Sequence, residues 1–192
     1  MSSSNQPPDH ALLEAAKKGD LKSFETLILR YQGMVYRFLF HFMGNGSDAE
    51  DLTQETFLNL YRKLSLHNSA QPFSSWLITM ARNLAISYHR KRAPTPLDPD
   101  IISAAIKDIC SGPESEIVLR EDIAELHLGL QKLPEALREV LIMRYLMDIP
   151  LQEVAELLNI PEGTAKSRVF KARNELRDLM FQINHQATAT AH

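Results

Sequence analysis

The stretch of this chain with the clearest chemical potential runs from residue 163 to residue 174, which contains four cationic side chains and no acidic one. Wound as a helix at 100° per residue, it presents a basic and polar face opposite an apolar stripe. That face, its first turn and its flanks consist of Thr164, Lys166, Ser167, Arg168, Phe170, Lys171, Arg173, Asn174 and Arg177. Such a face can neutralise phosphates while its first turns present side chains to base edges in a DNA major groove.

A cluster of Lys and Arg is by itself more often a solvated helix surface than a binding site. Phe170 favours a binding role, because a large aromatic ring opposite the apolar stripe requires a partner such as a thymine methyl group or a protein surface.

Two helices and a tight turn must position this face. Apolar residues recur at three and four positions through 151–158 and again through 165–179, with no strand-like alternation. Between them, Asn159 can take a left-handed conformation and Pro161 suits the first turn of the second helix. The stretch 151–179 therefore predicts a helix-turn-helix.

An acidic stretch, residues 48–55, begins another predicted helix. Ser47 and Glu50 form a capping box, and Asp51 lies in a first turn where the helix dipole favours anions. Helix capping does not account for Gln54 and Glu55, which lie beyond that turn. We therefore expect them to face a binding partner.

A further helix is predicted from residue 73, and its end is basic, with no acid between Arg82 and Arg92. The polar residues of this end are Arg82, Asn83, His89, Arg90, Lys91 and Arg92. They suit a nucleic-acid backbone, although a basic helix end also simply compensates the helix dipole. Three prolines within residues 94–99 then end the helix and, with the acidic residues that follow, mark a linker.

Length and composition indicate an all-α protein of two small helical domains. With 192 residues and 44% hydrophobic content, the chain can bury two modest cores. We predict a polar tail (1–10), a first domain (11–92), an acidic, proline-containing linker (93–115), a helix-turn-helix domain (116–180), within which a helix is expected over 117–130, and a C-terminal tail (181–192). Residues 114–192 carry 9 cations and 13 anions, a net charge of −4, whereas residues 1–92 carry 11 and 8, a net charge of +3.

Several classes of function are disfavoured. One cysteine, Cys110, and scattered histidines predict no metal site or other cofactor, and no residues suggest a catalytic centre or a small-molecule substrate. The absence of a membrane-length apolar run or a signal-peptide pattern predicts a cytoplasmic protein without membrane insertion. An enzyme is not expected.

Four stretches, taken together and in order, resemble the bacterial RNA polymerase sigma factors of the extracytoplasmic-function group. They are DAEDLTQETFLNLYRKL, FSSWLITMARNLAISYHRKR, LPEALREVLIMRYLMDIPLQEVAELLNI and EGTAKSRVFKARNELR, within residues 10–180. The resemblance implies a first domain that binds the polymerase clamp and the −10 promoter element. It implies a second domain that binds the −35 element and the polymerase flap. An anti-sigma protein is a further implied partner.

The resemblance also assigns residues. Asp51, Gln54 and Glu55 match clamp-contacting positions, and Asn83 matches a residue that helps to capture an unpaired promoter base. The implied −10 set is His67, Asn68, Arg82, Asn83, Arg90, Lys91 and Arg92, and the −35 set is the face described above. The chain departs from the family pattern at His67 and Asn68, where an aromatic and a basic residue are usual, and at Pro161, where Ser or Thr is common.

Two other functions remain as alternatives. A free-standing helix-turn-helix regulator would not need Gln54, Glu55 or the first domain, and a sigma-like decoy that binds only an anti-sigma protein would not need the basic face. Because the second domain is acidic outside that face, we expect the protein alone to bind promoter duplex weakly and to gain specificity and strand opening with polymerase.

Overall fold

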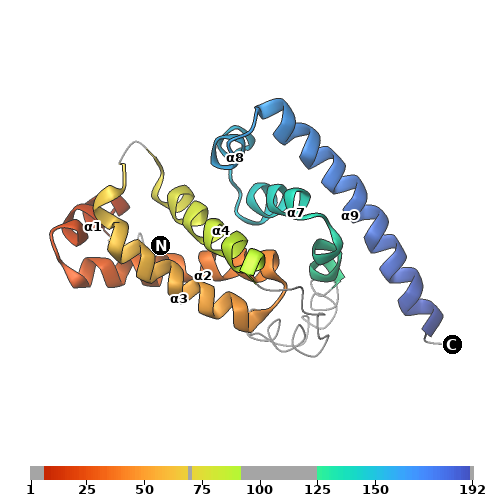
Figure 1. The fold of residues 1–192 in the computed structure, drawn as a ribbon, viewed down its shortest axis with the longest axis horizontal. Helices are drawn as coiled ribbons and strands as arrows, with labels where there is room; N and C mark the ends of the chain where they lie inside the picture. The colour runs from red at the N-terminus through yellow and green to blue at the C-terminus, as the bar shows by residue number, and fades with distance from the viewer. Residues whose placement is uncertain (1–6, 69–70, 92–124, 191–192) are drawn as a thin grey trace, which may run out of the picture.

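The computed structural model describes residues 7–68, 71–91 and 125–190, with side chains placed as far as residue 183. Within these ranges all regular elements are helices, and they gather into two groups, one on each side of the molecule (Figure 1). This confirms the all-α prediction. Arg92, Cys110, the predicted linker 93–115 and the start of the helix predicted from residue 117 lie outside the described residues. No helix in the described part of the chain combines the length and apolarity needed to cross a lipid bilayer.

The first domain packs four helices, α1 (Asp9–Lys17), α2 (Leu21–Met43), α3 (Gly46–Lys63) and α4 (Phe73–Lys91), with a short 3-10 turn, η1 (Leu64–Leu66), before α4. The central helix α2 buries an apolar stripe spaced at three and four residues, including the fully buried Leu27, Val35 and Phe38. It ends at Gly44, whose φ of 78° is left-handed and therefore suits glycine.

The start of α3 differs from the predicted capping box. Asn45, not Ser47, is the N-cap, and its side-chain oxygen accepts hydrogen bonds from the backbone N–H groups of Ser47 at 2.9 Å and Asp48 at 3.4 Å. The helix therefore begins two residues earlier than the predicted capping box, and an amide oxygen accepts from its first unpaired N–H groups. Asp48, Glu50 and Asp51 therefore lie inside the helix.

The second domain contains helical residues 125–132, α7 (Glu135–Leu141), a π-helical turn η2 (Ile142–Leu146), α8 (Leu151–Leu158) and α9 (Glu162–Thr190). Asn159 ends α8 with a φ of 52°, the left-handed conformation predicted for it. The long helix α9 continues past residue 180, so the tail predicted from residue 181 begins as helix (Figure 1).

The two domains pack against each other, because α2 contacts both α7 and η2. Buried apolar side chains of both domains, such as Phe40 and Leu39 from the first and Leu137 and Val140 from the second, belong to one continuous cluster. Exposing that surface to water costs roughly 25 cal/mol per Å². The apolar contact between the domains therefore favours this closed arrangement.

Candidate nucleic-acid interface

Buried alanines and a backbone cap position helix α9, which carries the face predicted to contact DNA. Ala165 and Ala172 are fully buried, which fixes the side of α9 that faces the domain. Pro161 stands immediately before α9 rather than in its first turn, where we predicted it. Its carbonyl accepts hydrogen bonds from the N–H groups of Thr164 at 2.9 Å and Ala165 at 3.1 Å. A residue preceding the helix needs no N–H of its own, so proline is accommodated there.

The face predicted to read DNA lies on the surface. Lys166, Ser167, Phe170, Lys171, Arg173 and Arg177 are exposed, and Thr164, Arg168 and Asn174 are half-buried. The Phe170 side chain is 70% exposed, which is unusual for a ring of this size. Lys171 and Arg177 have acidic neighbours on the same helix, Glu175 at 3.6 Å and Asp178 at 3.2 Å. Exposed ion pairs such as these contribute little to stability, so both cations are available to bind phosphate.

Helix α4 presents part of the predicted −10 set. Asn83, Arg90 and Lys91 are exposed, as predicted for residues that contact DNA. Asn68, in the loop before α4, is exposed and lines a polar groove of about 600 Å³ whose opposite wall is α8. The loop and the end of α4 thus offer accessible polar groups.

Two arginines of the predicted DNA-contacting sets are bound to one carboxylate. The Nε of Arg82, from α4, donates a hydrogen bond of 2.7 Å to Glu139 of α7. Arg168, from α9, lies 3.9 Å from the other oxygen of Glu139. The Glu139 side chain is only 4% exposed. No sequence signal marks Glu139, because its partners are distant along the chain. In this conformation Arg82 faces the second domain.

His67, which was predicted to contact DNA, is buried in this conformation. Its ring is 6% exposed and lies against Phe73 and Trp76, with centroid distances of 5.7 and 4.9 Å. Burial and, secondarily, the charge of Lys17 lower the pKa of His67. Two aromatic neighbours hold the ring in the domain, and in this conformation it cannot reach a base.

The proposed polymerase-contacting residues of α3 form an exposed face. Asp51, Gln54 and Glu55 are all exposed. The same face continues into Leu58, one further turn along, and beside it Tyr61; each is 58% exposed. Sequence reasoning missed these two apolar side chains. Their signal is positional: Leu58 is seven residues after Asp51 and lies outside the buried stripe of α3.

The described residues assemble no group of three or more His, Cys, Asp or Glu side chains that could hold a metal ion. His41 and His127 do meet across the domain interface, with their Nδ1 atoms 3.4 Å apart. Burial lowers the pKa of each ring to about 4, so both are neutral at pH 7.

Both helical domains match known families. Residues 27–95 match the family model Sigma-70 region 2, and residues 123–176 match Sigma-70, region 4. The RNA polymerase sigma-H factor of Pseudomonas aeruginosa is 32% identical over 180 residues, covering 89% of this chain and 93% of that protein. The ECF RNA polymerase sigma-E factor of Escherichia coli is 34% identical over 183 residues, covering 90% and 94%.

Solved structures share the fold. The sigma factor RpoE from Bartonella quintana, crystallised with the anti-sigma factor NepR, has a TM-score of 0.66 at 24% identity, covering 83% of this chain and 97% of that one. The CnrH structure, in complex with the cytosolic domain of CnrY, has a TM-score of 0.69 at 21% identity, covering 91% and 97%. At these identities the likeness bears on the fold alone.

Proposed function

This chain belongs to the extracytoplasmic-function (ECF) group of sigma-70 factors, transcription initiation factors that are not enzymes, and we propose how its two domains share that role. As a sigma factor it binds RNA polymerase and promoter DNA. We assign the −35 element to the exposed face of α9, the −10 element to the loop and end of α4, and the polymerase clamp to the exposed face of α3.

The observation that carries the −35 assignment is the exposure of Phe170 among cations. A ring that is 70% exposed, with Lys166 and Lys171 beside it, has both an apolar surface for a base and charges for the backbone. Base-edge and methyl contacts supply sequence preference, whereas phosphate contacts supply affinity. We therefore assign Phe170 and Lys166 to base contacts and Arg177 to the backbone.

For the −10 element, we propose that Asn83 helps to hold an unpaired base while Arg82, Arg90 and Lys91 contact phosphates. Holding a base outside the stack costs a few kcal/mol, which binding to the single strand must offset. An amide can hydrogen-bond a base edge, and Asn68 of the preceding loop can add a second such contact. Strand opening then follows from binding, without chemistry by this chain.

For polymerase, we propose that Asp51, Gln54 and Glu55 make polar contacts and that Leu58 adds an apolar one at the same face. Buried apolar contacts surrounded by polar ones are typical of protein interfaces. The second domain would bind the flap, as the family resemblance implies.

We further propose an anti-sigma partner and a cytoplasmic location. The two solved structures described above are both complexes, and one of them is named as a complex with an anti-sigma factor. Polymerase and its promoters are cytoplasmic in bacteria. We propose that an anti-sigma protein binds the same exposed faces of this chain.

In-vitro transcription on genomic DNA tests the function. Core polymerase with this protein should start transcripts at a defined set of promoters, and core polymerase alone should not. Phe170→Ala should alter the preference among −35 variants. Phe181→Ala is the matched control, since Phe181 is a second exposed ring on α9, 66% exposed, three turns beyond. Unchanged preference in Phe170→Ala would overturn the −35 assignment.

A further inference from the structure

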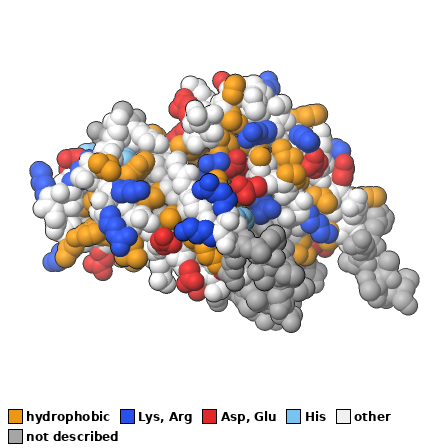
Figure 2. All heavy atoms as spheres, viewed as in Figure 1, with side chains coloured by type: hydrophobic (Ala, Val, Ile, Leu, Met, Phe, Trp, Pro, Cys, Tyr) orange, Lys and Arg blue, Asp and Glu red, His pale blue; other side chains and the backbone are white. Residues whose placement is uncertain are grey.

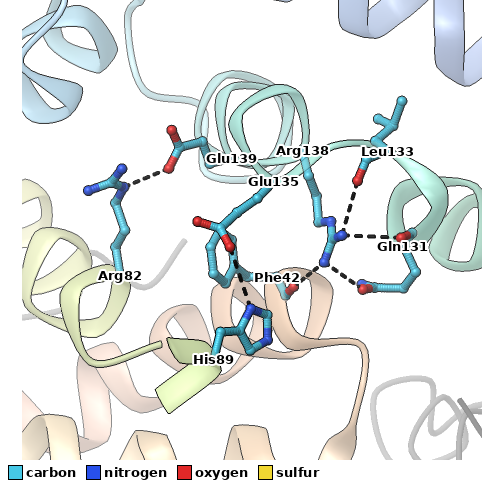
Figure 3. Close-up of polar contacts among 8 residues, drawn as sticks. All are labelled: Phe42, Arg82, His89, Gln131, Leu133, Glu135, Arg138 and Glu139. Atoms are coloured by element: carbon cyan, nitrogen blue, oxygen red, sulfur yellow. Dashed lines mark hydrogen bonds and ion pairs between the residues drawn. The ribbon is translucent and has the colours of Figure 1, made fainter. Parts of the chain in front are cut away.

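The domain interface contains a carboxylate that water cannot reach. Glu139 is 3% exposed, and a carboxylate so buried is stable only when it is paired. Arg82 supplies that pairing from the other domain, with a hydrogen bond of 2.7 Å (Figure 3). Arg168, in the same domain as Glu139, lies 3.9 Å from the carboxylate. Figure 2 shows Lys and Arg side chains gathered beside acidic ones at the middle of the molecule, where the domains meet.

Other contacts across the interface satisfy the end of α2. Arg138 donates a hydrogen bond of 2.7 Å to the carbonyl of Phe42, and Gln131 donates one of 2.6 Å to the carbonyl of His41. The last carbonyls of a helix have no partner within the helix, and its C-terminal end favours a cation. Arg138 also donates to Gln131 and to the Leu133 carbonyl, so its position is well defined (Figure 3). The two contacts with the Phe42 and His41 carbonyls are made only while the domains are together.

We propose that Glu139 is a conformational lock of the free protein: it pairs with Arg82, holds the two domains closed, and withholds Arg82 from promoter DNA until the domains separate. The role of Arg82 in DNA binding rests on the proposed function. The lock consists of Glu139 with its two partners, Arg82 and Arg168, and the evidence for it is the geometry of the domain interface.

The position of Arg168 makes the lock reversible. When Arg82 leaves, Glu139 keeps a cation of its own domain nearby, so opening does not strand a buried charge. A DNA phosphate can then replace Glu139 as the partner of Arg82, since both accept charge-assisted hydrogen bonds from a guanidinium group. While the closed form dominates, the apparent promoter affinity is the affinity of the open form multiplied by the fraction of molecules that are open.

The test compares the full-length protein with Glu139→Gln, which removes the buried charge while keeping the side chain's size. Small-angle X-ray scattering of the free protein should show a larger radius of gyration and maximum dimension for the variant. Anisotropy titration of a −10 single strand should show about tenfold tighter binding, within the usual range of coupling between two sites. Glu175→Gln is the control, because it removes one negative charge from the same domain and breaks only the exposed ion pair with Lys171.

A second variant tests the lock independently, in case Glu139→Gln does not fold. Arg82→Met leaves Glu139 beside Arg168 and should open the domains in scattering, while its circular dichroism stays that of a folded helical protein. If neither variant is larger than wild type or the control, the lock is wrong. If either opens and Glu139→Gln gains affinity for DNA, the proposal holds. If the domains open without any gain in DNA binding, the lock holds and the assignment of Arg82 to DNA fails.

Discussion

Acidification should destabilise this protein through the pair formed by His41 and His127. Their Nδ1 atoms lie 3.4 Å apart, His127 is fully buried, and its ring stacks on Phe40 with a centroid distance of 4.4 Å. Burial lowers the pKa of each ring from 6.5 to about 4. The neighbouring charges act in the same direction, since His127 and Arg37 lower the pKa of His41 and Arg138 lowers that of His127, whereas a hydrogen bond with the Gly44 backbone opposes them.

The sign and size of the effect follow from proton binding. Because each folded-state pKa lies below the unfolded value, the unfolded chain binds more protons between pH 6.5 and 4. Stability is therefore complete above pH 6.5 and is lost as the pH falls toward 4. At pH 5 the loss is about 2 kcal/mol for each histidine, or about 4 kcal/mol for the pair. Most carboxylates remain ionised at pH 5, so they add little in this range.

Urea unfolding followed by circular dichroism at pH 7, 6 and 5 measures this loss. His127→Phe keeps a ring on Phe40 but cannot be protonated, so its stability should fall by about 2 kcal/mol less than that of wild type between pH 7 and 5. His10→Gln, which replaces an exposed histidine, should follow wild type. If wild type and His127→Phe lose equal stability over this range, the buried pair does not control acid sensitivity.

Three further outcomes are expected. Replacing Gln54 and Glu55 with Ala should weaken the complex with core polymerase, measured by fluorescence titration, without changing the Tm, because both side chains are exposed; wild-type affinity would contradict the clamp assignment. Arg177→Ala should weaken binding to all promoters alike in anisotropy titrations and reduce the salt slope by about one, and a change in promoter preference would instead identify a base contact. Asn159→Ala should destabilise the second domain by about 1 kcal/mol in thermal unfolding, because Ala lacks the polar side chain that lets Asn adopt a left-handed φ of 52°, whereas Asn159→Gly should not, because glycine adopts this φ freely; equal losses would show that backbone conformation is not the cause.

Local pattern was sufficient for much of the fold. Apolar residues spaced at three and four positions predicted which side of α9 is buried and therefore also that Phe170 and Lys166 are exposed. This works because neighbours on a helix surface are set by sequence separation alone. Asn159 was a recognisable helix end for the same reason: its left-handed conformation is a local property of the backbone. The cap of α3 was misplaced because Asn45 and Ser47 are both good caps two residues apart.

What the tertiary structure decided is which polar groups meet across long separations. The pairing of Arg82 with Glu139 joins residues 57 apart, and that of His41 with His127 joins residues 86 apart. No periodicity encodes such partners, since they depend on how two separately formed helical groups dock. The same holds for His67, which family resemblance predicted to face DNA and which Phe73 and Trp76 enclose instead. Burial changes the chemistry of these side chains, and burial is a property of packing between elements, not of any one element's sequence.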